Sequence, residues 1–487
     1  MSNKTDVLFI HPGNHQKTYQ ELSKKHTAIA PPSWTSLLAN YVRKHGYSVS
    51  IHDTNISGFN ASRELNNYSP RLIVLMVYGH HPSASTQTMS SASDIINQIK
   101  EFDKFAAIAI GGTHPSAIPV RTLYEEKVDF VIVGEGAYQI VGILDYMKGK
   151  LNSIDDIEGV IYKREGGPSK LKVAPLIKYL DTDLDDYAID LLPDLNFYRA
   201  HSHHAFGYDD SSPYMAMNTS LGCPYSCNFC CINAVFGKPG IRYWNEYTVL
   251  RWIDDLVHKY GVRHIRFDDE LFVLDTNRLR FLCNELIDRN YGLNIWVYAR
   301  IDTISKDLLP LMKKAGFNWI CLGIESANKD VRIGVNKTIN KDIEYVVNII
   351  KNNGINIMGN YMFGLPDDTI QTMQETLDLA TKLNCEYANF YCTMAYPGSE
   401  LYKSFGDNHC VLPKTWDGYS QHSYDTQPLP TKHIPAKDVL QFRDDAFYKY
   451  FSNSKYLNMI SKKFGSDVKD EIDDMLKIKI KRRLLND

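Results

Sequence analysis

Short apolar runs alternate with amphipathic stretches through the first third of the chain. The runs at residues 7–10, 48–53, 71–77, 105–112 and 128–136 are rich in Val, Ile and Leu, and the stretches between them have helical spacing. Strands that are apolar on both faces are typical of a parallel sheet covered by helices on both sides. The pattern predicts a doubly wound, Rossmann-like α/β domain whose ligands bind at the carboxyl ends of the strands.

The same alternation begins again at Tyr214 and repeats about six times up to Cys392. Several helical stretches in this region end on glycine, at Gly261, Gly316 and Gly354, as a left-handed C-cap favours. Six βα units predict an open, partial (β/α)6 TIM barrel, in which the chemistry lies at the carboxyl ends of the strands.

The predicted domain organisation follows from these two alternations. A length of 487 residues favours about three domains. We predict the doubly wound domain over residues 1–150, a linker over 151–205, the barrel over 206–400 and a helical region over 401–487. The linker contains a hairpin pattern around Gly166, and the basic tail of the helical region has the pattern of a solvated helix face.

Composition excludes several classes of partner. A formal net charge of -3 gives no electrostatic reason to expect nucleic acid or anionic lipid. No apolar run approaches the roughly 18 residues of a spanning helix, and the N-terminus enters a strand without the pattern of a signal peptide. Nine cysteines, an odd number, favour a reducing compartment, so we expect a cytoplasmic protein that acts on a small molecule.

Three cysteines follow the first barrel strand in C-x3-C-x2-C spacing. They are Cys223, Cys227 and Cys230. Four-iron clusters usually take four thiolates, so a loop that offers three predicts a 4Fe–4S cluster with one iron open for a substrate or cofactor. The alternative is zinc, with a fourth ligand from Cys231, His201, His203 or His204. Zinc sites normally show paired C-x2-C units, which this chain lacks.

This spacing resembles the radical S-adenosylmethionine (SAM) superfamily. The resemblance implies that SAM chelates the open iron and is cleaved to a 5'-deoxyadenosyl radical, and that Phe229 lies near the adenine. It also implies roles for polar residues at the strand ends. Asp269 and Glu270 would hold the SAM amino group, Arg300 the carboxylate and Glu325 the ribose, with Ser326 and Asn360 nearby.

Each of these polar residues also has a purely structural interpretation. Asp268 and Asp269 have the pattern of N-terminal helix caps, and Arg300 could pair with Asp302 on the surface. A charge that closes an apolar run, as Glu325 does, is rarely left without a partner.

The turns of the N-terminal domain resemble the cobalamin-binding domain of one radical SAM subfamily. The similarity is carried by Pro31-Pro32, the G-G-x-H loop and a glycine-glutamate-glycine turn. The implied cobalamin contacts are Tyr78, Gly111, Gly112, Thr113, His114, Gly134, Glu135 and Gly136. Neighbouring His80, His81 and His11 also lie at this edge.

Two departures from that pattern limit the resemblance. Ala137 stands where the subfamily has a second glutamate, and Asn55 stands at the histidine position of the nearest echo of the D-x-H-x-x-G motif. We therefore predict that this motif supplies no histidine to cobalt. The alternative is a corrinoid-type sheet that has lost its ligand and serves as a structural lid.

The combined interpretation is a cobalamin-dependent radical SAM enzyme that methylates an unactivated carbon of a small molecule and receives electrons from a flavodoxin or ferredoxin. The alternatives are a non-methylating radical cyclase, oxidase or dehydratase and, third, a corrinoid- or metal-sensing protein. The sequence leaves the substrate open. A Tyr- and His-rich loop with Tyr419, His422 and Tyr424 is a candidate to close over it.

Overall fold

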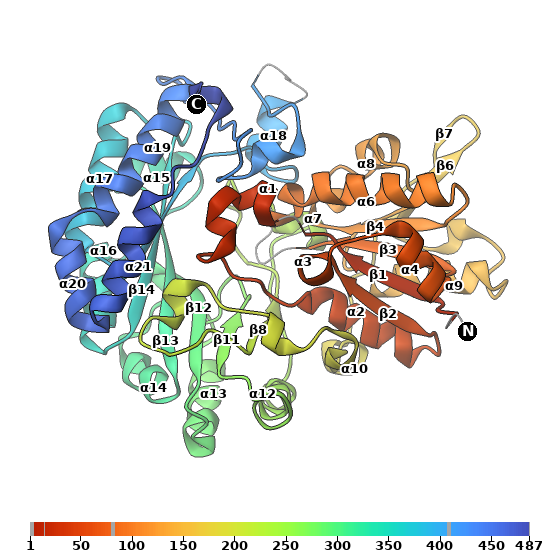
Figure 1. Cartoon of the computed structure of the whole chain (residues 1–487), viewed down its shortest axis with the longest axis horizontal. Coiled ribbons are helices and arrows are strands. Elements are labelled where there is room, and N and C mark those ends of the chain that lie inside the picture. The colour runs from red at the N-terminus through yellow and green to blue at the C-terminus, as the bar shows by residue number, and fades with distance from the viewer. Residues whose placement is uncertain (1–3, 14, 79–82, 407–410, 487) are drawn as a thin grey trace.

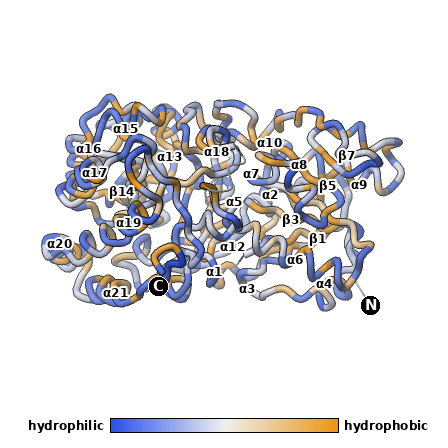
Figure 2. Tube along the Cα trace, turned by 90° about the horizontal axis from the view of Figure 1, so that it is seen from above, coloured by the Kyte–Doolittle hydropathy of each residue, from blue (hydrophilic) through white to orange (hydrophobic). Residues whose placement is uncertain are grey.

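The computed structural model describes residues 4–13, 15–78, 83–406 and 411–486. Two sheets, each built mainly of parallel strands, lie side by side along the long axis, and helices pack against each of them (Figure 1). Seen from above, the apolar segments of the N-terminal sheet lie inside its layer of helices (Figure 2). Among the described residues, we find no helix with the length and apolar character needed to cross a membrane.

The N-terminal sheet has the strand order β2-β1-β3-β4-β5, all parallel, followed by β6 and β7. Its strands are β1 (Val7–His11), β2 (Val49–Asp53), β3 (Leu72–Val77), β4 (Ile108–Gly112), β5 (Phe130–Ile132), β6 (Val160–Arg164) and β7 (Gly167–Pro168). The predicted doubly wound domain is confirmed.

Both faces of the central part of this sheet are buried because β3 is apolar at every position and β1 at every position but its last. On β1, Val7 and Phe9 pack in the core that includes α2 (Ser33–Lys44) and α9 (Ala137–Met147). Their neighbours on the strand pack in a second core against α4 (Ala61–Tyr68) and α6 (Met89–Phe102). The alternation of side chains along a strand thus builds one core on each face.

Part of the segment predicted as a linker, residues 151–205, pairs with the N-terminal sheet. Strand β6 pairs antiparallel with β5, and β7 pairs with β6, so the hairpin around Gly166 extends the N-terminal sheet. The sequence indicated the hairpin but not the edge that it would join.

The second sheet is the predicted partial barrel, with six parallel strands in the order β15-β14-β13-β12-β11-β8. The strands are β8 (Tyr214–Met217), β11 (His264–Phe267), β12 (Asn294–Arg300), β13 (Phe317–Glu325), β14 (Asn356–Phe363) and β15 (Tyr387–Cys392). The helices between them are α11 (Asn233–Phe236), α12 (Glu246–Tyr260), α13 (Thr276–Arg289), α14 (Leu309–Lys314), α15 (Lys329–Gly334), α16 (Ile343–Asn352) and α17 (Ile370–Leu383).

The C-terminal region packs against the last barrel strands through α19 (Ala436–Phe451), α20 (Ser454–Phe464) and α21 (Ser466–Lys477). The basic tail is not the solvated helix face that its pattern predicted. Arg482 is fully buried, with its guanidinium on Asp444 at 2.9 Å and on the Ser423 carbonyl at 3.2 Å. This ion pair ties the end of the chain to α19.

Candidate functional site

The cysteine loop leaves β8 and is held at its start by a buried carboxylate. Asp269 accepts hydrogen bonds from the Thr219 amide at 2.6 Å, the Thr219 hydroxyl at 2.7 Å and the Ser220 hydroxyl at 2.6 Å. Both of its oxygens are therefore engaged. In the structure Asp269 thus positions the segment leading into the cysteines, and its predicted contact with the SAM amino group stays a prediction.

The far end of the loop is anchored to the segment that follows β13. The Asn228 amide donates to the Val335 carbonyl at 3.0 Å, and Asn336 donates to the Ser226 carbonyl at 2.9 Å. Gly222, just before the first cysteine, has φ +90, and a Cβ there would lie 2.5 Å from the Gly240 carbonyl oxygen. The loop that carries the three cysteines is therefore held in place at several points along its length.

The three predicted ligands fit an iron–sulfur cluster. Cys223, Cys227 and Cys230 are half-buried free thiols. Burial raises the pKa of Cys223 to about 11 and that of Cys230 well above its usual value. Without a metal these two thiols are protonated near neutral pH, so cluster binding must release protons.

Two of the histidines named for the zinc alternative, His203 and His204, lie away from the cysteine loop. No group of three or more His, Cys, Asp or Glu side chains is placed to hold one metal ion, within the ranges that the structure describes. His203 and His204 pack against Trp296 at the amino-terminal half of β12, away from the loop at the other end of the strands. Ligands of a cubane cluster sit on separate iron corners and need not converge on one point.

Arg300 ends β12 beside the cysteine loop. Its guanidinium lies 4.0 Å from the centre of the Tyr225 ring, and Nη1 lies 3.6 Å from the Cys227 sulfur. The pairing with Asp302 exists at 3.5 Å, but Arg300 is only 7% exposed, so it is not a surface ion pair. Its Nε has no hydrogen-bond partner among the described residues. A buried guanidinium with a spare donor next to the loop suits an anionic ligand.

Glu325 ends β13 and forms a buried ion pair with Lys337, a partner that the sequence did not reveal. Glu325 has φ +65, a left-handed conformation that is uncommon for glutamate and directs its carboxylate. On the next strand, Asn360 donates to the Cys321 sulfur at 2.9 Å. Glu325, Asn360, Phe229 and Cys230 all line one cavity of about 330 Å³. The structure thus brings together four of the predicted cofactor residues.

Ser326 faces elsewhere. Its hydroxyl accepts from the Asn328 amide at 3.1 Å and lies 3.2 Å from the Thr376 hydroxyl. This side chain supports the turn after β13, and a direct contact with SAM does not follow from its geometry.

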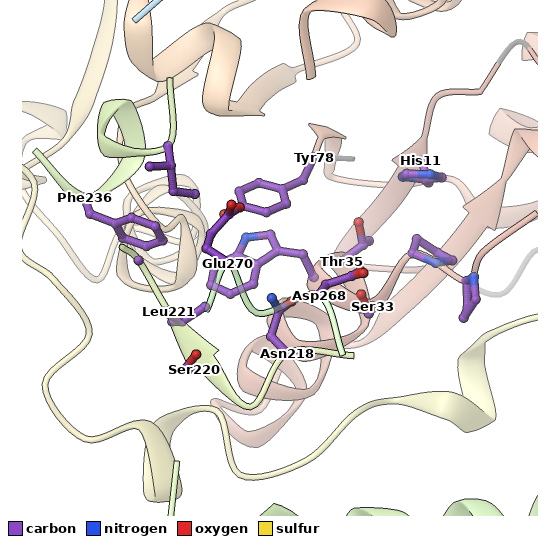
Figure 3. Close-up of a pocket in the computed structure, with 15 residues that line it drawn as sticks. His11, Ser33, Thr35, Tyr78, Asn218, Ser220, Leu221, Phe236, Asp268 and Glu270 are labelled. Carbon is purple, nitrogen blue, oxygen red and sulfur yellow. The ribbon is translucent and has the colours of Figure 1, made fainter. Parts of the chain in front are cut away.

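Glu270 lies where the two sheets meet. It lines a crevice of about 40 Å³ together with His11, Trp34 and Tyr78 of the N-terminal domain. Figure 3 shows the Tyr78 ring beside Glu270. Burial, followed by the neighbouring Asp268, raises the pKa of Glu270 to about 8. A cationic ligand would restore the charged form of this carboxylate.

The turns predicted to contact cobalamin lie at the carboxyl edge of the N-terminal sheet. Two of their residues, Gly112 and Glu135, also stabilise the protein itself. Gly112 has φ +133, and a Cβ there would lie 2.2 Å from the Val77 carbonyl oxygen of the adjacent strand. Glu135 is buried in an ion pair with Arg242 and accepts from the Ile177 amide at 2.6 Å. Gly134 and Gly136 also have positive φ values, of +95 and +96.

Gly112→Ala should therefore destabilise the N-terminal domain by at least about 2 kcal/mol, because strain and overlap with a neighbouring backbone add. Denaturant unfolding measures the loss. Gly46→Ala is the matched control, since Gly46 has φ +82 but a Cβ added there would meet no atom within 4 Å. Equal losses in the two variants would contradict the overlap.

The carboxyl edge fits a ligand rich in hydrogen-bonding groups. Five buried polar atoms there have no partner among the described residues. They are His11 Nδ1, Trp34 Nε1, Ser36 Oγ, Asn55 Oδ1 and His114 Nε2. Unpaired buried groups cost about 1–3 kcal/mol each, and their concentration at one edge favours a bound polar molecule. A corrinoid carries many amide side chains and suits this donor and acceptor set.

The His114 side chain is buried, although it follows a strand end at the carboxyl edge of the sheet. Its Nδ1 lies 3.2 Å from the Thr86 hydroxyl, and its ring meets the edge of Trp416 at 4.4 Å. Thr113 is buried at the start of α7 (Thr113–Ala117), the helix that also carries His114. His80 and His81 lie outside the described residues.

Asn55, which stands at the histidine position of the D-x-H-x-x-G motif, lies in the short helix after β2. Asp53 caps the short helix after β2 by accepting from the Asn55 amide at 3.0 Å and also from the Tyr198 hydroxyl at 3.0 Å. His52 on the same strand bonds the Gly58 carbonyl at 2.7 Å.

The cavity behind the cysteines extends down the barrel and is lined largely by residues that sequence reasoning missed. They include Tyr19, His201, His203, Arg266, Trp296, Tyr298, Tyr387, Tyr391, Arg443 and Met475. Several come from outside the barrel strands. Of the three loop residues singled out above, only His422 lines the cavity; Tyr419 is buried nearby and Tyr424 is 41% exposed. Charged or aromatic residues at alternate positions of buried strands were the available signal.

Comparisons with known proteins agree with this architecture. Residues 217–380 match the Radical SAM superfamily, and residues 24–144 match the B12 binding domain. An uncharacterized methyltransferase of Pyrococcus horikoshii is 27% identical over 438 residues, covering 88% of this chain and 89% of the relative.

A further relative and a solved structure are similar to both halves of the chain. The anaerobic magnesium-protoporphyrin IX monomethyl ester cyclase of Rubrivivax gelatinosus is 24% identical, covering 93% of this chain and 78% of the relative. The solved structure of the cobalamin-dependent SAM radical enzyme OxsB, with aqua-cobalamin and SAM bound, has a TM-score of 0.71 at 16% identity, covering 96% and 71% of the two chains. At that identity the likeness shows the fold alone. The chain thus carries a B12-binding domain over residues 24–144 ahead of a radical SAM domain over residues 217–380.

Proposed function

We propose that this protein is a cobalamin-dependent radical SAM methyltransferase that acts on an unactivated carbon of a small molecule. The observation that carries the proposal is that the carboxyl edge of the N-terminal sheet meets the carboxyl edge of the barrel sheet. Glu270 and Gly222, at the start of the cysteine loop, line one crevice with residues at the carboxyl edge of the N-terminal sheet. Cys230, at the end of the same loop, lines the barrel cavity. Two cofactors and a substrate could thus be held around one point.

When bound, the cluster supplies the electron that cleaves SAM, and cobalamin carries the methyl group to be transferred. The residues of this chain bind and orient the reactants. We assign the SAM carboxylate to Arg300, its ribose to Glu325 and its ammonium to Glu270. Phe229 would contact the adenine and Asn360 the remaining polar atoms.

The test is anaerobic reconstitution with iron, sulfide and hydroxocobalamin, followed by incubation with SAM, a reductant such as flavodoxin or ferredoxin, and candidate substrates. Radical cleavage yields 5'-deoxyadenosine and methyl donation yields S-adenosylhomocysteine. Both products, together with a methylated compound, are expected. A protein that takes up iron and cleaves SAM but binds no cobalamin would contradict the methyltransferase proposal.

A second candidate function is a non-methylating radical reaction. The similarity to the Rubrivivax gelatinosus cyclase over 93% of this chain favours keeping it. Formation of 5'-deoxyadenosine without S-adenosylhomocysteine, in protein that binds cobalamin, would select this candidate.

A further inference from the structure

The deep end of the barrel cavity carries polar atoms that the protein leaves without partners. Arg266 on β11 is 1% exposed, and its Nε donates to Asp268 at 2.5 Å. Its Nη2 has no hydrogen-bond partner among the described residues, and neither has the indole N–H of Trp296 on the neighbouring strand. The guanidinium lies 5.4 Å from the centre of the Trp296 ring. Buried N–H groups without acceptors are rare, so this pair indicates a ligand that supplies acceptors.

His203 closes the same end of the cavity from the segment before the barrel. It is 4% exposed, and neither ring nitrogen has a partner within the described parts of the chain. Its ring stacks on Tyr387 at 4.1 Å with an interplanar angle of 17°, and meets the edge of Trp296 at 5.4 Å. Burial lowers the pKa of His203 well below its usual value, so the neutral ring offers one donor and one acceptor. Aromatic surfaces around these polar atoms suit a planar ring.

The charges along the cavity favour an anion over a cation. Among the described lining residues, the only carboxylate is Glu325, which is paired with Lys337 at the cofactor end. The lining arginines are Arg266 and Arg443. The carboxylate of Asp444 forms ion pairs with both Arg443, at 2.7 Å, and Arg482, at 2.9 Å. Because one carboxylate pairs with two guanidinium groups, the positive charge near Arg443 is only partly compensated.

The polar atoms of Arg266 and Trp296 lie far enough from the cofactor end to leave room for a substrate between them and the cysteine loop. Trp296 and Arg300 are four residues apart on β12, which corresponds to about 13 Å along the strand. A ring compound held at Arg266 would therefore extend toward the cysteine loop without displacing SAM.

We propose that the methyl acceptor is a planar ring compound bearing a carboxylate, with its ring against His203 and Trp296 and its carboxylate accepting hydrogen bonds from Arg266 and His203. This inference rests on the proposed function and names the substrate class for the same site. The Arg266–Asp268 pair fixes one edge of the guanidinium and leaves the other for the ligand.

The test uses a matched pair of probes, naphthalene carboxylate and naphthylmethylamine, which share a ring and differ in charge. Calorimetric titration is carried out on the reconstituted holoenzyme with S-adenosylhomocysteine present, so that the SAM site is filled without turnover. We expect the carboxylate to bind at least about 10-fold more tightly than the amine. Arg266→Gln should weaken carboxylate binding by about 30-fold or more, and His203→Phe by about 5- to 10-fold.

His203→Phe keeps the test valid even if Arg266→Gln fails to fold with Asp268 left unpaired. Because His203 makes no hydrogen bond within the described protein, its replacement should not lower the melting temperature. Arg289→Gln, at an ion pair on α13 far from the cavity, is the control and should leave both affinities unchanged.

Three outcomes would overturn the proposal. They are tighter binding of the amine, unchanged carboxylate affinity in a folded His203→Phe protein, and no carboxylate binding at millimolar concentration by holoenzyme that still binds S-adenosylhomocysteine. None of these bears on SAM cleavage or methyl transfer, which the product assay above measures separately.

Discussion

Replacement of Cys227 by alanine is expected to remove the cluster and, with it, all cleavage of SAM. Two thiols cannot replace three on the same loop, and the Cys227 sulfur is the one that Arg300 approaches to 3.6 Å. Iron and sulfide per chain should fall to the level of unreconstituted protein, and 5'-deoxyadenosine should not form. The same result is expected for Cys223→Ala and Cys230→Ala.

Cys231→Ala is the matched control, because this cysteine is adjacent in sequence and equally small. It is 2% exposed and packs with Met394, Tyr396 and Tyr419, as a buried apolar residue would. Iron content and SAM cleavage should both survive. A four-iron spectrum retained by Cys227→Ala, or lost in Cys231→Ala, would show that the ligand set has been misassigned.

Replacement of Arg300 by methionine should weaken SAM binding by about 2–4 kcal/mol, or roughly 30- to 1000-fold in Kd. The reason is the loss of a buried guanidinium that presents a spare donor beside the cysteine loop. Equilibrium binding of SAM to the reconstituted, oxidised protein measures the effect. Oxidised protein is used so that SAM is not consumed.

Iron content is measured on the same Arg300→Met samples, because Arg300 lies close to a cluster ligand. Arg263→Met, at an exposed arginine whose side chain bonds only the adjacent Val262 carbonyl among the described residues, should bind SAM normally. If Arg300→Met kept its iron and bound SAM as tightly as the wild type, the carboxylate site would have to lie elsewhere.

The fold could be predicted almost completely because it depends on local pattern. The period of apolar residues marks strands and helices, glycine marks several helix ends, and the cysteine spacing marks the loop. What the pattern could not give was the partner of each charged residue. The antiparallel edge at β6, the burial of Arg482 and the Lys337 partner of Glu325 all depend on contacts between distant segments.

The candidate site shows the same division. The strand-end rule correctly located Arg300, Glu325 and Asn360 near the cysteine loop, since carboxyl ends of parallel strands share an edge. The rule says nothing about the direction of a side chain. Asp269 accepts hydrogen bonds from Thr219 and Ser220, and Ser326 accepts one from the Asn328 amide. His203 was considered only as a zinc ligand because its sequence neighbours gave no hint that it reaches the barrel floor.

The walls of the barrel cavity come from two sources with different freedom to change. Its cofactor end is built from strand termini and the cysteine loop, whereas Tyr19, His203, His422 and Arg443 enter from segments before and after the barrel strands. Mutations in those outer segments can reshape the room for substrate while the radical-generating apparatus stays intact. New substrate ranges could therefore arise by divergence of the connecting segments alone, and a directed-evolution library confined to them would sample substrate choice without sacrificing SAM cleavage.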